Sequence, residues 1–297
     1  MQQPRIVFVS GATGKQGGAV ARAVLARGHK VIALTRYPTS DAAKELAASG
    51  AEIVTGNFGE PNSLKEALAQ SDTVYAMGTP FGKSIEQEVR ESIDLIETAH
   101  EAGVGHIIYG SAAGADQNSD VPHFDSKYRV ERHLAGLRTE YTISAPTGFM
   151  DLFADRTNPM IFLEGLRRGE LRMGLPGSRP VQYVAATDIG AFVAELVERR
   201  ESVFGQRFQI AGDELTGKQT AAVLSRASGR AISYVGFEPD ALRSHNPNFA
   251  KMFEWLNSVG YSVDRNALRQ EFPKVRWHSL EEWARLQDWQ VLLAPAA

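Results

Sequence analysis

The feature that most constrains the fold is a glycine-rich segment directly after the first apolar run of the chain. The run Ile6–Val9 leads into Gly11-Ala12-Thr13-Gly14-Lys15-Gln16-Gly17-Gly18, and a segment with an apolar helical face follows. A strand, a glycine turn and a helix in this order are typical of a dinucleotide-binding loop. The first glycine permits a tight turn, the second lets the backbone approach a diphosphate, and the third lets helix and strand pack closely. The residues expected to contact the cofactor here are Gly11, Thr13, Gly14, Lys15, Gln16 and Gly17.

Besides cofactor binding, this loop has two other possible interpretations. Glycines also mark ordinary turns between a strand and a helix, and a plain turn stays open as the alternative. An ATP-binding phosphate loop is excluded, because Lys15 is followed by Gln16 where such a loop needs a Ser or Thr hydroxyl for magnesium. The favoured ligand is therefore a nicotinamide dinucleotide.

Short β-rich runs alternate with segments of helical period from Arg5 to about Ala145, which is typical of βαβ units. The expected strands are Arg5–Val9, Lys30–Thr35, Glu52–Thr55, Thr73–Met77, His106–Tyr109 and Tyr141–Ala145. The helices expected between them are Gly17–Ala26, Asp41–Ala48, Pro61–Ala69, Ser84–Ala102 and Asp125–Ala135. The pattern predicts an α/β fold with a doubly wound parallel Rossmann sheet, which binds its ligand at the carboxyl ends of the strands.

The alternation fades after Pro146. We expect residues 1–149 to form the Rossmann domain, completed by about residues 181–211, and residues 150–297 to form a smaller α+β lobe. In this second half we expect strands at Val181–Val184 and Phe204–Ile210, a loop-rich stretch at Gly169–Pro180, and helices at Asp188–Arg199, Gly217–Ser228, Pro239–Leu242, Phe249–Ser258 and Ser279–Leu286. The four tryptophans all follow residue 250 and are expected in the core of the small lobe.

Composition excludes several classes of function. Charged residues make up 23% of the chain and the formal net charge is -3, so a specific nucleic-acid partner is not expected. There is no cysteine, which removes disulfides and thiolate metal sites, and the seven histidines form no HExxH-type pair, so we expect no metal. No run approaches the ~20 apolar residues of a membrane helix, so we expect a cytoplasmic protein with no membrane partner.

The residue after the second expected strand indicates which dinucleotide is bound. An NAD enzyme places Asp or Glu there for the ribose hydroxyls, but Thr35 is followed by Arg36. A guanidinium forms bidentate, charge-assisted hydrogen bonds to a phosphate, and Lys15 adds a second positive charge near the same 2′-phosphate. We therefore expect NADP(H) to be preferred over NAD(H), with two solvated surface cations as the alternative interpretation.

Four segments occur in order along the chain: Gly11–Gly18, Thr35-Arg36, His123-Phe124-Asp125-Ser126-Lys127 and Val184…Asp188-Ile189-Gly190. With them the sequence resembles the NmrA-like family of atypical short-chain dehydrogenase/reductases over nearly its whole length. The resemblance implies a cofactor in the cleft between the Rossmann domain and the small lobe. It also implies that Asn57 and Phe58 lie near the adenine, that Gly78, Thr79 and Pro80 border the ribose and phosphates, and that Ser111, Pro146, Thr147, Gly148 and Phe149 border the nicotinamide.

Three residues are candidates for chemistry: Lys127, His123 and Ser111. Catalytic short-chain dehydrogenases carry Tyr-x-x-x-Lys, in which the lysine binds the nicotinamide ribose and the tyrosine donates a proton. The resemblance implies that Lys127 keeps the lysine role and that His123 occupies the tyrosine position. Residues four apart share a helix face, so both side chains can point at the cofactor. Because an ordinary imidazole titrates at ~6.5, His123 is a candidate proton donor, and a structural role at the helix start is the alternative.

Two functions follow from the resemblance. The first is an NADPH-dependent oxidoreductase that passes hydride to a quinone, a dye or a carbonyl-like small-molecule acceptor. The second is a redox sensor without catalysis, in which NADP(H) occupancy changes the affinity for a protein partner. The sequence leaves the acceptor, the partner and the oligomeric state open, with a homodimer as one option. An open pocket above the nicotinamide would favour the enzyme. A pocket blocked by side chains of Met150, Phe153 or the Arg172–Arg179 loop would favour the sensor.

Overall fold

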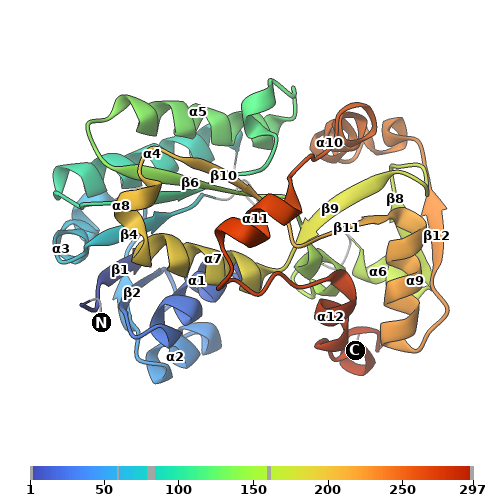
Figure 1. Ribbon diagram of the computed structural model, residues 1–297, viewed down its shortest axis with the longest axis horizontal. Helices are drawn as coiled ribbons and strands as arrows, with labels where there is room; N and C mark the ends of the chain where they lie inside the picture. The colour runs from blue at the N-terminus through green and yellow to red at the C-terminus, as the bar shows by residue number, and fades with distance from the viewer. Residues whose placement is uncertain (1–2, 59, 79–83, 159–161, 295–297) are drawn as a thin grey trace.

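A central parallel sheet of seven strands organises the first part of the molecule (Figure 1). The computed structural model describes residues 3–58, 60–78, 84–158 and 162–294. The strand order is β10-β6-β5-β4-β1-β2-β3, and every pair in this sheet is parallel. The strands are β1 Ile6–Val9, β2 Lys30–Thr35, β3 Glu52–Thr55, β4 Thr73–Ala76, β5 Ile107–Gly110, β6 Tyr141–Pro146 and β10 Arg207–Ile210.

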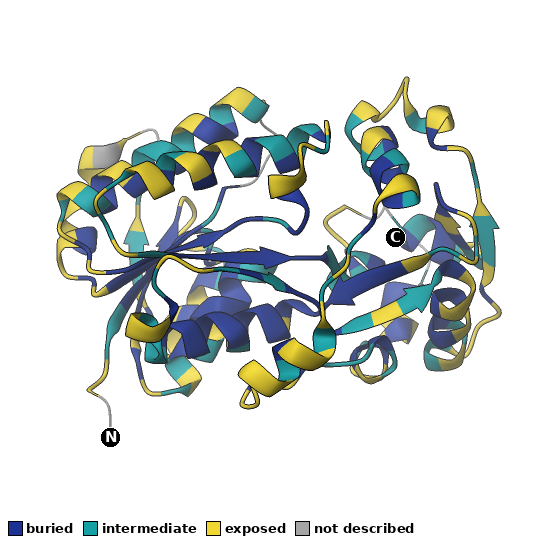
Figure 2. Ribbon diagram, turned by 45° about the horizontal axis from the view of Figure 1, so that its top comes forward, coloured by how far each residue is buried: buried dark blue, intermediate teal, exposed yellow. Residues whose placement is uncertain are grey.

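Helices cover both faces of this sheet because alternate residues of each strand point to opposite faces. On β1, Val7 and Val9 join one apolar cluster while Phe8 joins another. The first face is covered by α1 (Lys15–Ala26), α2 (Asp41–Ala48) and α7 (Ala186–Glu198), and the second by α3 (Lys65–Ala69), α4 (Ile85–Glu101) and α5 (Pro122–Gly136). Figure 2 shows the strands of the sheet buried between these two helical layers, whose outer faces are exposed. The doubly wound Rossmann fold expected from the alternation is confirmed.

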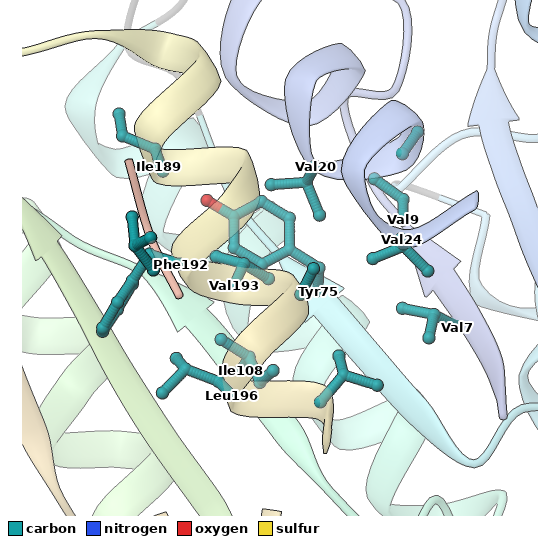
Figure 3. Close-up of a cluster of buried hydrophobic side chains, with 14 of the residues drawn as sticks. Val7, Val9, Val20, Val24, Tyr75, Ile108, Ile189, Phe192, Val193 and Leu196 are labelled. Carbon is teal, nitrogen blue, oxygen red and sulfur yellow. The ribbon is translucent and has the colours of Figure 1, made fainter. Parts of the chain in front are cut away.

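Helices α1 and α7 lie against each other on the first face (Figure 3). Val20 of α1 lies close to Ile189 and Val193 of α7, with the ring of Tyr75 between the helices and the sheet. A Cβ on Gly190 would lie 2.4 Å from the Ala19 carbonyl oxygen, so only glycine allows this approach. The Asp188-Ile189-Gly190 segment thus explains how α7, from the second half of the chain, covers the first strand.

The second lobe contains two small sheets. One has the order β11-β9-β7 and the other pairs β12 with β8. Its elements are β7 Gly148–Phe149, α6 Leu163–Arg167, β8 Glu170–Met173, β9 Pro180–Val184, β11 Asp213–Thr216, α9 Gly217–Ser228, β12 Ser233–Gly236, α10 Pro247–Ser258, α12 Leu280–Arg285 and α13 Trp289–Leu292. Helix α11 (Arg265–Glu271) buries Leu268 in the apolar cluster that contains residues of α1 and α7. Short 3-10 helices lie at Pro61–Ser63, Ala115–Gln117, Met150–Ala154 and Pro239–Leu242, and the short helix α8 at Arg200–Val203.

The structure differs from the sequence expectations in both halves of the chain. The stretch expected as a loop at Gly169–Pro180 contains β8, and the helix expected at Pro61–Ala69 is a 3-10 turn followed by α3. Trp277 packs in the apolar cluster under α7 and not with the other tryptophans in the small lobe. The strand β10 extends the main sheet beside β6, whereas β9 pairs with β7 and β11 in the second lobe. No helix within the described ranges is long and apolar enough to span a bilayer.

Candidate functional site

The strand order places the topological switch point of the sheet between the carboxyl ends of β1 and β4. From β1 the chain adds strands in one direction, β2 and then β3, and from β4 it adds β5 and β6 in the other. Val9 of β1 is in register with Tyr75 of β4, so both strands end at the same edge. Ligands of doubly wound sheets bind at such a switch point. The glycine loop directly follows β1, so it lies at this switch point.

The glycine loop has the backbone geometry of an anion site. Gly11 adopts a positive φ of 61°, and the Gly14 N–H donates to the Gly11 carbonyl oxygen at 2.9 Å. Gly14 precedes α1 with no side-chain capping hydrogen bond, so no capping side chain satisfies the first N–H groups of the helix. Such groups and the helix dipole together favour a phosphate.

Two glycines of this loop have different roles. A Cβ on Gly17 would lie 2.3 Å from the Gly11 carbonyl oxygen and 2.7 Å from that of Ser10, so Gly17 is required for the helix to pack on the strand. A Cβ on Gly14 would meet only the Gly11 oxygen, at 3.3 Å, and the φ of Gly14 is an ordinary -91°. The fold therefore tolerates a side chain at position 14 better than at position 17.

The polar side chains of the loop already have partners. Lys15 Nζ lies 2.7 Å from Asp155 Oδ1 of the second lobe, and Gln16 Nε2 donates to the Tyr75 hydroxyl at 2.6 Å. Thr13 is exposed. The sequence predicted Lys15 and Gln16 as cofactor contacts, and the structure links one of them to the opposite lobe.

The residues predicted to select the cofactor's adenosine half lie beyond β2 and β3. Arg36 directly follows β2, is exposed, and its guanidinium carbon lies 5.5 Å from the centre of the Tyr37 ring. No ion pair of Arg36 occurs among the described residues. Asn57 is exposed, and Phe58 packs at the edge of the apolar cluster under α4. An exposed guanidinium at the end of β2, without an ion pair among the described residues, suits a phosphate group.

Lys127 is held in place at the end of β4. Its Nζ donates to the Gly78 carbonyl oxygen at 2.6 Å and lies 2.8 Å from Glu88 Oε1, with only 10% of the side chain exposed. Glu88 on α4 is almost fully buried and also accepts a hydrogen bond from Ser126 at 2.9 Å. The predicted neighbours Thr79 and Pro80 lie outside the described residues. The structure therefore fixes the lysine by contacts from two elements.

His123 lies one helical turn before Lys127, at the start of α5. Its ring packs edge-on against Phe124 with centroids 4.7 Å apart. Burial, and next the positive charge of Lys127, lower the pKa of His123 to about 4. The sequence interpretation assumed a pKa near neutrality, and the structure differs because its surroundings disfavour a second cation. At neutral pH the imidazole is uncharged.

Ser111 follows β5 and is buried. Its hydroxyl donates to Glu131 of α5 through a short hydrogen bond, and Glu131 Oε2 accepts from Arg207 Nε of β10 at 2.9 Å. Arg207 also donates to the Ala112 carbonyl oxygen at 3.0 Å. The single hydroxyl proton of Ser111 is thus committed to Glu131, and the network ties the end of β5 to α5 and β10.

The segment after β6 connects the two lobes. Pro146 ends β6, and Thr147 donates to the Ile210 carbonyl oxygen from its N–H at 3.1 Å and from its hydroxyl at 3.2 Å. Gly148 and Phe149 form β7, which pairs with β9 of the second lobe. Met150 and Phe153, named as side chains that would block the cleft, are fully buried in the core of the second lobe.

The sequence interpretation missed the acidic partners of its own candidates: Glu88, Glu131 and Asp155. Glu88 gave a signal, because it shares the buried face of α4 with Ser92, Leu95 and Ala99 at helical spacing. Asp155 gave no such signal, because its loop has no periodic sequence pattern and its partner Lys15 lies 140 residues away in the sequence. Across the ranges that the structure describes, no group of three His, Cys, Asp or Glu residues is placed to hold a metal ion.

A glycine loop at the switch point of a doubly wound parallel sheet defines the Rossmann class of nucleotide-binding folds. Within that class, the model of the NmrA-like family matches residues 3–284. The chain therefore belongs to the NmrA-like family, as its motifs indicated.

Relatives include both reductases and a regulator. An NAD(P)H azoreductase of Xenophilus azovorans is 30% identical over 234 residues, covering 77% of this chain and 76% of that protein. The NADPH complex of the quinone oxidoreductase QOR2 of Escherichia coli has a TM-score of 0.77 at 23% identity, covering 94% of this chain and 98% of that one. NmrA, a negative transcriptional regulator in complex with NADP, has a TM-score of 0.80 at 20% identity, covering 97% of this chain and 100% of that one. Structural likeness at these identities establishes the fold.

Proposed function

We propose that the protein is an NADP(H)-dependent oxidoreductase that passes a hydride to a quinone, a dye or a carbonyl-like acceptor. The observation that carries the proposal is the position of Lys127, buried and paired at the end of β4, on the edge of the sheet that holds the glycine loop. The similarity to an NAD(P)H azoreductase and to an NADPH-dependent quinone oxidoreductase supports the same reaction class.

Lys127 has the donors that this role needs. An ammonium group carries three protons: one is donated to the Gly78 carbonyl oxygen, and one is available to the Glu88 carboxylate, which lies at ion-pair distance. No other contact of the ammonium with an oxygen occurs among the described residues. The remaining proton can bind a ribose hydroxyl of the nicotinamide half, the role that the family resemblance gives this lysine. Bound NADPH supplies the hydride, and Lys127 orients the ring that delivers it. Glu88 acts through Lys127 as a positioning residue.

The state of the two candidate proton donors favours acceptors that need no donor from the protein. The imidazole of His123 is neutral at pH 7 because its pKa is about 4, and the Ser111 hydroxyl donates to Glu131. A quinone meets this condition: it takes a hydride from NADPH and a proton from water, giving NADP⁺ and a hydroquinone. An aldehyde gives a strongly basic alkoxide and depends more on a placed acid. We therefore rank quinones and dyes above aldehydes as acceptors.

The substitution His123→Phe tests this ranking. It keeps ring volume and removes the titratable group, so quinone reduction should stay within about threefold of the parent rate from about pH 6 to pH 8. Over that range the pH lies above the pKa of His123, so its ionisation does not change and no inflection from it is expected. Steady-state rates across this range provide the measurement. A fall of about 100-fold or more with a changed pH profile would instead make His123 the donor.

The preference for NADPH is tested at Arg36. An exposed arginine pairing with a phosphate should contribute about 5–10-fold in affinity, because screening by water limits such a pair to roughly 1 kcal/mol. Arg36→Ala should weaken NADPH binding by that factor and leave NADH binding unchanged, as measured by calorimetry. Arg230→Ala, an exposed arginine of the second lobe, is the matched control and should change neither constant. Equal constants of the parent protein for both cofactors would remove the preference.

A screen tests the function itself. NADPH oxidation is followed by absorbance with quinones, dyes and aldehydes, beside a calorimetric titration of the cofactor. Turnover with at least one quinone or dye supports the oxidoreductase. Tight cofactor binding without turnover on any acceptor supports the second function, a redox sensor that binds a protein partner. The engaged state of Ser111 and the low pKa of His123 are the observations that keep the sensor in consideration.

A further inference from the structure

One ion pair joins the glycine loop to the second lobe. Lys15 is the first residue of α1, directly after Gly14, and its Nζ lies 2.7 Å from Oδ1 of Asp155, which ends the 3-10 helix Met150–Ala154. The Asp155 carboxylate is 9% exposed, whereas the Lys15 side chain is 35% exposed. The carboxylate is thus the buried, fixed member of the pair, and the ammonium is the accessible one.

Local hydrogen bonds hold the Asp155 carboxylate in this position. The same oxygen accepts from the Thr157 N–H at 2.8 Å, the Thr157 hydroxyl at 2.6 Å and the Asn158 N–H at 3.2 Å. Burial would raise the pKa of Asp155, but the bonds from Lys15 and Thr157 outweigh it and hold the pKa below its ordinary value. Asp155 therefore stays charged at neutral pH and does not depend on Lys15 alone for its orientation.

This arrangement conflicts with anion binding at the start of α1. A phosphate at the uncapped N–H groups of the helix lies next to the residue that follows Gly14, and an ammonium is its natural partner. The Lys15 ammonium already forms an ion pair with the Asp155 carboxylate. A second acid, Asp151, lies close enough for the charge of Lys15 to lower its pKa, although burial raises it overall. An incoming phosphate meets a cation that two carboxylates of the second lobe already attract.

We propose that Asp155 sets the affinity for the phosphate-bearing cofactor by competing with a cofactor phosphate for the Lys15 ammonium. The ion pair links the second lobe to the glycine loop, and it opens when the cofactor binds. The apparent dissociation constant equals the intrinsic constant divided by the fraction of molecules in which Lys15 is not paired with Asp155. This inference rests on the cofactor binding of the proposed function, but not on any acceptor or turnover.

A double-mutant cycle with NADPH and NADH tests the competition by calorimetry. Asp155→Asn removes the charge and keeps an oxygen for the Thr157 and Asn158 N–H groups, so NADPH should bind about 3–10-fold more tightly. Lys15→Met should weaken binding by a similar factor. In the Lys15→Met background, Asp155→Asn should change affinity by less than about twofold, because no ammonium remains to be released. Glu86→Gln, which breaks the exposed pair with Arg129, is the matched control and should change nothing.

The outcomes distinguish a failure of the proposed competition from a failure of the proposed oxidoreductase function. A gain in Asp155→Asn for both cofactors assigns Lys15 to the diphosphate, and a gain for NADPH alone assigns it to the 2′-phosphate; both support the competition. Unchanged affinity in Asp155→Asn overturns it. A full gain that persists without Lys15 also overturns it, because through-space repulsion then explains the effect. Binding without turnover on any acceptor would reject only the oxidoreductase, and this cycle would still be decisive.

Discussion

Gly14→Val is expected to raise the dissociation constant for NADPH by about 100-fold while the protein stays folded. The side chain would occupy the space through which the backbone approaches the diphosphate, and losing about two charge-assisted hydrogen bonds costs roughly 3 kcal/mol. The fold should survive, because the φ of Gly14 suits any residue and a Cβ there meets only one oxygen at 3.3 Å. Calorimetry measures the affinity, and circular dichroism the melting temperature.

Two other glycines make this result specific. Gly136→Val, at the exposed end of α5 where a Cβ meets nothing within 4 Å, should leave the affinity unchanged. Gly17→Val should lose both fold and binding, because its Cβ would lie 2.3 Å from a backbone oxygen. A Gly14→Val protein that NADPH stabilises against heat as strongly as it does the parent would show that the cofactor does not bind at this loop.

Lys127→Met is expected to lower both stability and cofactor affinity. Methionine keeps the length of the buried stem but leaves Glu88 as an uncompensated charge, and breaking a buried pair in this way typically costs about 3–5 kcal/mol. Loss of the proposed hydrogen bond from Lys127 to the ribose should weaken NADPH binding by about 10-fold. Denaturant unfolding measures the stability, and calorimetry the affinity of the protein that remains folded.

The double substitution Lys127→Met with Glu88→Gln separates these two effects. It removes the unpaired charge, so much of the lost stability should return, while NADPH affinity stays low because no ammonium is present. Glu88→Gln alone keeps the lysine and should reduce affinity less than Lys127→Met. If the double variant bound NADPH as tightly as the parent, Lys127 would be a structural residue and not a ligand of the cofactor.

The main sheet could be predicted from sequence because its signals are local. The expected strands Lys30–Thr35 and Glu52–Thr55 have the bounds that the structure shows, since β2 is a buried apolar run and both strands are short β-rich runs bounded by turns. The second half of the chain was harder to predict from sequence. The helix α11 buries only Leu268, so it has no apolar stripe, and β12 is a four-residue strand with half-buried and exposed positions that resembles a loop.

The candidate site likewise contains residues that could be predicted from sequence and residues that could not. Gly11 and Gly17 could be found because each serves a backbone conformation or approach that the adjacent strand and helix require, and Gly14 could be found from its spacing between them. The partners that decide the chemistry could not, because Glu88 with Lys127, Glu131 with Ser111 and Asp155 with Lys15 join distant parts of the chain. The pKa of His123 is likewise a property of its burial and of Lys127 in the folded protein, and no residue spacing reveals it.

Single-turnover oxidation of bound NADPH is the most direct test of the proposed function. Protein saturated with NADPH is mixed with an excess of a quinone or a triphenylmethane dye, and the absorbance of the reduced nicotinamide is followed in time. We expect this absorbance to be lost in one exponential phase. The phase should be slower when the transferred hydrogen of NADPH is deuterium, and slower again in Lys127→Met. Bound NADPH that stays reduced with every acceptor, at saturation confirmed by calorimetry, would contradict the account and leave the protein a sensor.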